Sequence, residues 1–215
     1  LSAVLRRLKA ELDRERAERR DVELLRSRYV KNLPVLRELF YTNLLDGRLE
    51  AGTERARAAQ LDIDLSGGKW AVALAYIGGG SRDALSTLSV QKLLEEALTE
   101  DRCKLFLYND WIALILSLTE TFSVYDLIRA LDRACALTAS YLALTLTVGV
   151  GAPCRELSSL PRSAAEARTA LEYRSIVGRG QVIYIGDLEP DRSPLLSFDE
   201  ADERVLTAAI KLGNE

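Results

Sequence analysis

The sequence predicts an α+β fold in which a coiled-coil helix precedes a domain with a mainly antiparallel sheet. Three observations predict it. Apolar residues at four-three spacing run through the highly charged residues 1–40, a pattern typical of coiled-coil helices. Trp70 to Ile77 is an unbroken apolar run of strand length, which indicates a central strand. The later periodicities follow the order strand, helix, hairpin, helix, strand, helix, strand, which is a split βαβ plan.

Residues 1–47 are expected to form the coiled-coil segment, through which the chain should pair with a second copy of itself. The dimerisation seam consists of apolar residues at four-three spacing: Leu1, Leu5, Leu8, Leu12, Val22 and Tyr29. The spacing continues through Leu33, Leu36 and Phe40, and three polar residues interrupt it, Glu15, Arg19 and Arg26. A basic membrane-binding helix is the rival interpretation, but acidic residues are interleaved with the basic ones throughout.

Two residues should shape the end of this helix. Pro34 lacks the N–H that an interior turn requires, so we expect it to kink the helix or restart it. Gly47 is a suitable C-terminal stop. Residues 48–68 should then hold a short helix, from about Thr53 to Gln60, and a connection to the domain proper.

The domain proper should span residues 69–190. A helix is expected near Ser89–Thr99, followed by the strands Cys103–Tyr108 and Trp111–Leu118. Asn109-Asp110 joins these strands, and its residue types suit the positive φ angles of a two-residue hairpin.

The second half of the domain should contain two more helices and two more strands. Ser123 is expected to cap a helix that ends near Tyr141, and Ser163 with Glu166 has the spacing of a capping box ahead of a helix that ends near Gly178. The expected strands are Leu144–Val150 and Gln181–Ile185. We expect the helices to cover largely one face of the sheet. Residues 191–215 should form a final helix.

Composition restricts the classes of function. The formal net charge is -3 and no basic stripe persists through the globular part, which argues against a free-standing nucleic-acid surface. Cys103, Cys135 and Cys154 are widely spaced and form no CxxC pattern, which suits the reducing cytoplasm. No apolar run reaches the roughly 20 residues of a membrane span. The chain starts at Leu1 and contains no Met, so we expect neighbouring segments in a longer protein.

Five phrases follow this order of elements: LPVLRELFYTNLLDGRL (Leu33–Leu49), LDIDLSG (Leu61–Gly67), LTVGVGAP (Leu146–Pro153), LSSLPRSAAEARTALEYRSIVGRG (Leu157–Gly180) and DEADERVLTAAIKLGN (Asp199–Asn214). Together they resemble the degenerate GGDEF-like domain, with its nucleotide-cyclase-like fold, found in AraC-type response regulators of the YesN-like group. The resemblance implies a receiver domain before the coil and a helix-turn-helix domain after the last helix, so that DNA is contacted outside this chain. It also implies a non-catalytic segment that dimerises and relays a signal between them.

Residual cyclase activity is the enzymatic alternative. Active relatives of this family carry a Gly-Gly-acidic-acidic-Phe signature on the hairpin and an acidic metal ligand near the end of the first strand. Here the hairpin reads Tyr108-Asn109-Asp110-Trp111 and the first strand ends Tyr76-Ile77-Gly78-Gly79. One carboxylate cannot replace the oxygen ligands that divalent cations need, so we expect no catalytic residues, no metal and no cofactor.

Arg129 and Asp132 have the spacing of the family's Arg-x-x-Asp product-inhibition motif. They follow the hairpin instead of preceding it, so we expect a solvated ion pair on a helix.

Sensing of a small molecule, a nucleotide or a sugar, is the remaining alternative. Its ligand would occupy a cleft formed by Ile77, Gly78, Gly79, Asn109 and Trp111. Trp111 and Tyr108 would then stack on a flat ligand, whereas the structural interpretation is that they pack across strands. Gly149 and Gly151 are expected to mark a bulge or a close backbone approach. Cys154, in an expected loop, is the one candidate for oxidant sensing.

Overall fold

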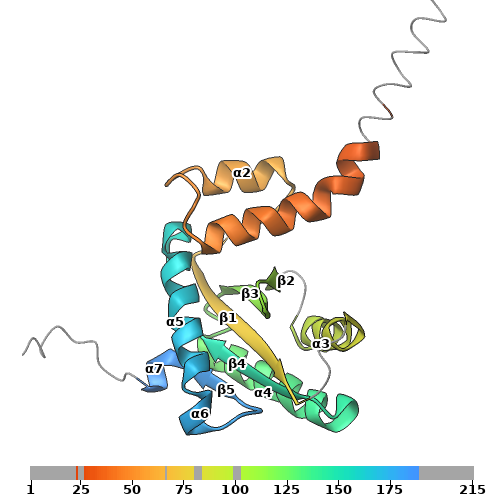
Figure 1. The fold of residues 1–215 in the computed structure, drawn as a ribbon. Helices are drawn as coiled ribbons and strands as arrows, with labels where there is room; N and C mark the ends of the chain where they lie inside the picture. Colours follow the sequence, from red (N-terminus) through yellow and green to blue (C-terminus); the bar gives the residue numbers. More distant parts are fainter. Residues whose placement is uncertain (1–22, 24–26, 66, 80–83, 99–102, 189–215) are drawn as a thin grey trace, which may run out of the picture. The chain divides into compact units, whose positions relative to one another are not determined.

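The computed structural model describes residues 23, 27–65, 67–79, 84–98 and 103–188 (Figure 1). Part of the expected dimerisation seam, namely Leu1, Leu5, Leu8, Leu12 and Val22, lies outside the described residues, and so do its polar interruptions Glu15, Arg19 and Arg26. The final helix expected within residues 191–215 also lies outside them.

The N-terminal helix is continuous over residues 27–45. Pro34 therefore does not restart it. The residues one turn before Pro34 are exposed, so water can solvate the carbonyl that loses its N–H partner. The expected stop at Gly47 is confirmed: Gly47 has φ +67°, its N–H donates to Leu44 O (3.3 Å), and the Arg48 N–H donates to Asn43 O (2.9 Å). These two bonds form a Schellman motif.

Five strands form one sheet in the order β2-β3-β1-β4-β5. Their bounds are β1 Lys69–Gly78, β2 Cys103–Tyr108, β3 Trp111–Leu118, β4 Thr145–Val150 and β5 Val182–Tyr184. Neighbours pair antiparallel except β4 and β5, which are parallel. The expected central strand and hairpin are confirmed, and the sheet is mainly antiparallel as the sequence predicts.

Helices cover both faces of this sheet, so the expectation of one covered face was wrong. One face packs against α3 (Ala84–Ala97) and α4 (Val124–Leu142). The other packs against α5 (Leu160–Glu172), α2 (Glu54–Gln60) and the end of the N-terminal helix (Figure 1). The reason lies in β1, because all its residues from Trp70 to Ala75 are buried and neither face can be left to water.

The helices begin and end partly as expected. Ser123 caps α4 in a capping box with Asp126. α3 begins five residues before the expected Ser89. The remaining short elements are η1 (Leu157–Ser159), α6 (Arg174–Val177) and α7 (Ile185–Leu188). In the part of the chain that is described, no helix is long and apolar enough to cross a membrane.

The capping box expected at Ser163 and Glu166 was wrong. α5 starts at Leu160, three residues earlier, with a proline in its first turn. Ser163 is buried inside the helix, where its hydroxyl accepts the Val72 N–H (3.1 Å) and donates to Ala152 O (2.9 Å). Glu166 accepts the Ala152 N–H (3.0 Å). Both side chains therefore attach α5 to the sheet.

The close approach expected at two glycines is confirmed. A Cβ on Gly149 would stand 2.2 Å from Ala167 O, and one on Gly151 would stand 2.0 Å from Ser163 O. Real Cβ atoms do not come so near to a carbonyl oxygen. Only glycine at these positions lets the backbone of α5 lie against β4.

Candidate functional site

The β2–β3 turn is the position where a catalytic signature would lie. Tyr108 pairs with Trp111, so the loop has two residues. Asn109 has φ +53°, as expected for the hairpin, whereas Asp110 is not among the residues with positive φ. The turn therefore orients Asn109 and Asp110 at the rim of the sheet, between its two faces.

One side of this turn borders a cavity of about 220 Å³, here called the hairpin cavity. It is lined by Ala75, Ile77, Thr87, Leu107, Asn109, Asp110, Trp111 and Ile112. Three of the five residues expected to form a cleft, Ile77, Asn109 and Trp111, thus meet at one cavity. Gly78 pairs with Thr145 on β4, and Gly79 follows it with φ +80°; neither lines the cavity.

The chemistry of the hairpin cavity is poor in charge. Among its described lining residues, Asp110 is the one acidic residue and none is Lys or Arg. Within the residues that the structure covers, no group of three or more His, Cys, Asp or Glu side chains could hold a metal ion.

On the other side of the sheet, five aromatic residues form a continuous row, here called the aromatic ladder: Phe40, Tyr41, Phe106, Tyr108 and Trp111. The ring centroids of Tyr41 and Phe106 are 5.0 Å apart and the rings are stacked. Successive rings elsewhere in the ladder are 5.7 to 6.5 Å apart. The ladder joins the N-terminal helix to the hairpin, and Tyr108 and Trp111 pack against each other across the strands.

A polar side chain contacts each of the two ladder residues that flank the hairpin turn, Tyr108 and Trp111. The Tyr108 hydroxyl donates to Asp46 Oδ1 at 2.5 Å, just beyond the N-terminal helix. The Arg168 guanidinium of α5 lies 5.1 Å from the Trp111 ring centroid, within range of a cation–π interaction. Burial, and then the bond to Asp46, raise the pKa of Tyr108 above its ordinary value, and burial raises the pKa of Tyr41 to about 12. Both phenols are therefore uncharged at neutral pH.

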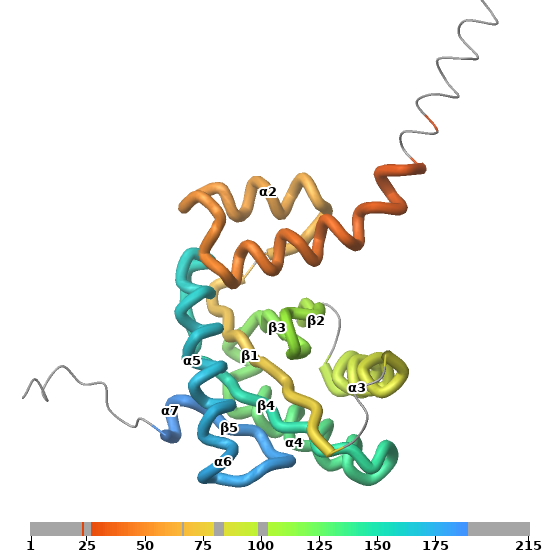
Figure 2. The backbone as a smooth tube through the Cα atoms, in the orientation of Figure 1, coloured from red at the N-terminus to blue at the C-terminus, as the bar shows by residue number. Residues whose placement is uncertain are grey.

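Hydrogen bonds also fasten the N-terminal helix to the end of α2, which runs beside it in Figure 2. Arg37 Nε donates to Leu61 O (2.8 Å), and its Nη2 donates to Asp62 O (3.1 Å). The Tyr29 hydroxyl donates to Gln60 O (2.9 Å). Tyr29, an expected seam residue, remains about half exposed. The helix is thus attached to the domain at several points along its length.

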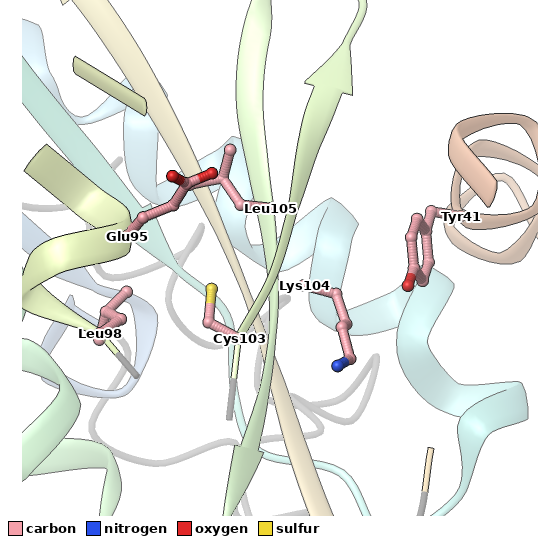
Figure 3. A pocket seen from close by; sticks show the side chains of 6 residues that line it. All are labelled: Tyr41, Glu95, Leu98, Cys103, Lys104 and Leu105. Carbon is pink, nitrogen blue, oxygen red and sulfur yellow. The ribbon is translucent and has the colours of Figure 1, made fainter. Parts of the chain in front are cut away.

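A second cavity, of about 260 Å³, lies at the outer edge of β2 and is here called the edge cavity. It is lined by Tyr41, Glu95, Leu98, Cys103, Lys104 and Leu105 (Figure 3). Cys103 and Lys104 point to opposite sides of the strand, as successive strand residues do. The cavity therefore wraps around the edge of β2.

Burial disfavours the thiolate form of all three cysteines. Burial raises the pKa of Cys103 and of Cys135 to about 12, and that of Cys154 to about 11. Oxidant sensing needs a thiolate at neutral pH, and these shifts are in the opposite direction. Cys154 is instead part of a backbone bridge with Trp70.

Arg129 and Asp132 do not pair with each other. Arg129 Nη2 binds Asp126 Oδ1 at 2.7 Å, and Asp132 Oδ1 accepts the Val182 N–H of β5 at 3.1 Å. The expected pair was wrong because each residue has a better partner on its other side. Sequence reasoning also missed Arg37, Asp46 and Arg168, whose partners lie 24 residues or more away along the chain or on another element.

Comparisons with known proteins agree with the resemblance at the level of the domain. A family model described as a GGDEF-like domain matches residues 46–173. In the comparison with curated proteins, nothing matched the chain.

Two solved structures are similar to this chain. One is the active GGEEF domain of a diguanylate cyclase from Vibrio cholerae, at 14% identity and a TM-score of 0.44, covering 61% of this chain and 88% of that one. The other is the GGDEF domain of YfiN, also called TpbB, from Pseudomonas aeruginosa, at 17% identity and a TM-score of 0.45, covering 65% of this chain and 91% of that one.

Proposed function

Because this chain belongs to the GGDEF-like domain family, we propose that it is a non-catalytic dimerisation and signal-relay segment of a bacterial response regulator. In this proposal the parent is a cytoplasmic AraC-type transcription factor, and the chain links a receiver domain to a helix-turn-helix output. The observation that carries the proposal is the aromatic ladder, since it connects the N-terminal helix to the hairpin and α5 without any catalytic group.

The chemistry of the hairpin supports a non-catalytic role. A cyclase must hold metal ions and triphosphates at this point, which takes several oxygen ligands and cations. Among the described residues, the lining of the hairpin cavity offers one carboxylate and one amide. The hairpin would then be a structural joint between the sheet and the N-terminal helix.

Exposed apolar side chains on the N-terminal helix support dimerisation. Phe40 continues the seam in the sequence, but it is 4% exposed and belongs to the domain's own core. Leu36, one turn before Phe40 on the seam, is 36% exposed, whereas Val35 and Leu39 lie away from the buried side of the helix and are 66% and 56% exposed. We infer that a second copy covers these three apolar residues where the coil meets the domain, since they directly follow the expected coil along the chain.

The relay itself would act through stacked contacts. A rotation or shift of the N-terminal helix moves Tyr41, which stacks on Phe106 of β2. Phe106 contacts Tyr108, which contacts Trp111, and Trp111 lies under Arg168 of α5. Packed aromatic rings transmit such displacements because they cannot be compressed. The polar residues Glu15, Arg19 and Arg26 would keep the seam from locking in one arrangement.

The proposal is tested by strengthening dimerisation through the coiled coil and following Trp111, the residue of the aromatic ladder that lies farthest along it from the N-terminal helix. Replacing Glu15, Arg19 and Arg26 by Leu should strengthen self-association and shift the NMR signal of the Trp111 indole N–H. The chain has two tryptophans, so Trp111→Phe assigns the signal. In a Phe106→Leu background the shift should be lost, and in Phe122→Leu, a matched change on the other face of the sheet, it should persist.

If the dimer is measurably tighter but the Trp111 signal does not change, the aromatic ladder does not transmit the signal. Unchanged self-association would count against the seam itself.

Sensing of a small molecule is a second candidate function, and one observation favours it. The hairpin cavity lies where three of the expected cleft residues meet. A ligand there would contact Trp111, the last ring of the aromatic ladder. Its binding would therefore act on the same connection between the hairpin and the N-terminal helix.

A further inference from the structure

The hairpin cavity is formed by residues of four elements, β1, α3, β2 and β3, and by the turn between the last two. Ala75 and Ile77 come from β1, Thr87 comes from α3, and Leu107 and Ile112 come from the hairpin strands. Asn109 and Asp110 close one end. A molecule in this space would therefore touch the end of the central strand, a helix and the turn at once.

The volume of the cavity sets the size of such a molecule. About 220 Å³ exceeds the cavity of about 150 Å³ that holds one benzene in an engineered protein. It is smaller than the roughly 300 to 1,000 Å³ of sites for drug-sized ligands. One ring or one branched aliphatic group with a short polar arm fits within this volume.

The lining determines the chemistry of that molecule. Its inner part is aliphatic, because Ala75, Ile77 and Ile112 all line it. Among the described lining residues, the polar groups are Thr87, Asn109 and the carboxylate of Asp110, which is their one formal charge. In this described lining an anion would meet a carboxylate, whereas an ammonium or amide N–H would meet acceptors.

We propose that the hairpin cavity binds a small apolar amine, with its apolar group between β1 and α3 and its ammonium toward Asp110. The proposal rests on the sensing function and replaces the nucleotide or sugar of that hypothesis by a different class of ligand. It is independent of the dimeric relay, because binding alone can be measured without any output.

Three probes of nearly equal size separate the charge states: benzylamine, benzyl alcohol and benzoate. NMR titration of the whole chain should give saturable shifts near Ile77 and Thr87 with benzylamine, with a dissociation constant on the order of 1 mM for about eight non-hydrogen atoms. Benzyl alcohol should bind about two- to five-fold more weakly, because Asp110 is exposed and its charge is partly screened. Benzoate and GTP with magnesium should not bind at the cavity.

Two variants test the location. Asp110→Asn should abolish the preference for benzylamine over benzyl alcohol while leaving the fold intact. Thr87→Phe should fill the cavity and remove both ligands, whereas the matched change Ser89→Phe on the same helix, at a residue that does not line the cavity, should leave binding unchanged.

Saturable binding of GTP or benzoate at these residues would overturn the proposed ligand class. Absence of any saturable shift with benzylamine on the order of 10 mM, roughly ten times the expected constant, would overturn the site. If benzylamine binds but the solution mass does not change, the site stands and the sensing function fails.

Discussion

The two faces of the sheet are built from different residues, and the central strand shows the contrast most clearly. On the face toward α3 and α4, β1 presents Ala71, Ala73 and Ala75. On the face toward α5 and the N-terminal helix, it presents Trp70, Val72 and Leu74. Small side chains let a helix lie close to the strand on the first face, whereas the second face is filled by large side chains of the sheet itself.

The faces also differ in their polar contacts. The α3/α4 face has a mainly aliphatic core of Leu, Ile, Val and Ala with Cys135, and Phe122 and Tyr184 pack against it. The α5 face contains the aromatic ladder together with directional contacts from Asp46, Ser163 and Arg168. Aliphatic packing is non-directional, but a stacked ring or a short hydrogen bond specifies one arrangement. This difference indicates that the first face stabilises the fold and the second fixes the N-terminal helix and α5 relative to each other.

The largest effect is expected from a cavity on the aliphatic face. Leu131 of α4 is fully buried, and Leu131→Ala should lower the free energy of unfolding by about 2 to 5 kcal/mol. Chemical denaturation of the wild type and the variant measures this difference in the free energy of unfolding. The same variant should leave the dissociation constant of the dimer unchanged. A weakened dimer would contradict the proposal that this face stabilises the fold without affecting the N-terminal helix.

Gly149→Ala should disturb the α5 face by overpacking. Its Cβ would collide with Ala167 O at 2.2 Å, so α5 must move and the free energy of unfolding should fall by about 1 to 3 kcal/mol. Gly68→Ala is the matched control, because a Cβ there meets nothing within 4 Å. Equal stability of the two variants would show that α5 does not rest on β4 as described.

Removing one hydroxyl tests the directional contact of the same face. Tyr108→Phe deletes the hydrogen bond to Asp46 and should cost about 1.5 to 3 kcal/mol, as bonds to charged groups do. A double-mutant cycle with Asp46→Ala isolates the pair, because alanine has no acceptor for the hydroxyl. Tyr141→Phe, at a residue that is 77% exposed, should have no effect. Additive single changes would contradict a direct bond.

The smallest effect concerns the cap of α4 and depends on pH. Hydrogen bonds from Ser123, and then the Arg129 guanidinium, lower the pKa of the exposed Asp126 below its ordinary value. A lowered pKa means that this contribution to stability is complete above the unfolded pKa of about 3.9 and is lost as pH falls through the folded pKa. The difference in Tm between the wild type and Asp126→Ala should therefore shrink as the pH falls from 6 to 3. A constant difference would exclude the charge as the cause.

Features governed by neighbours in the sequence could be predicted. The apolar run of β1, the Asn109-Asp110 turn, the Ser123 cap and the Gly47 stop depend on residues within one or two turns of each other. Ser163 and Glu166 have the correct local spacing for a capping box, yet their partners are Val72 and Ala152, on other segments. Spacing cannot show such partners, and periodicity cannot show which face of a sheet a helix covers.

The candidate site could be predicted only in part for the same reason. Ile77, Asn109 and Trp111 were identified because they flank a strand end and a turn, which are local features. The aromatic ladder depends on Tyr41 lying against Phe106, and nothing within the sequence pattern of either segment specifies the other. Long-range contacts of this kind define the proposed relay.

The central claim is that this chain dimerises through its N-terminal helix. Light scattering across a range of concentrations should give the mass of a dimer for the whole chain and of a monomer for a version lacking residues 1–31. If both versions are monomers, or if the truncated version still dimerises, the coil is not the dimer interface and the relay through it is contradicted.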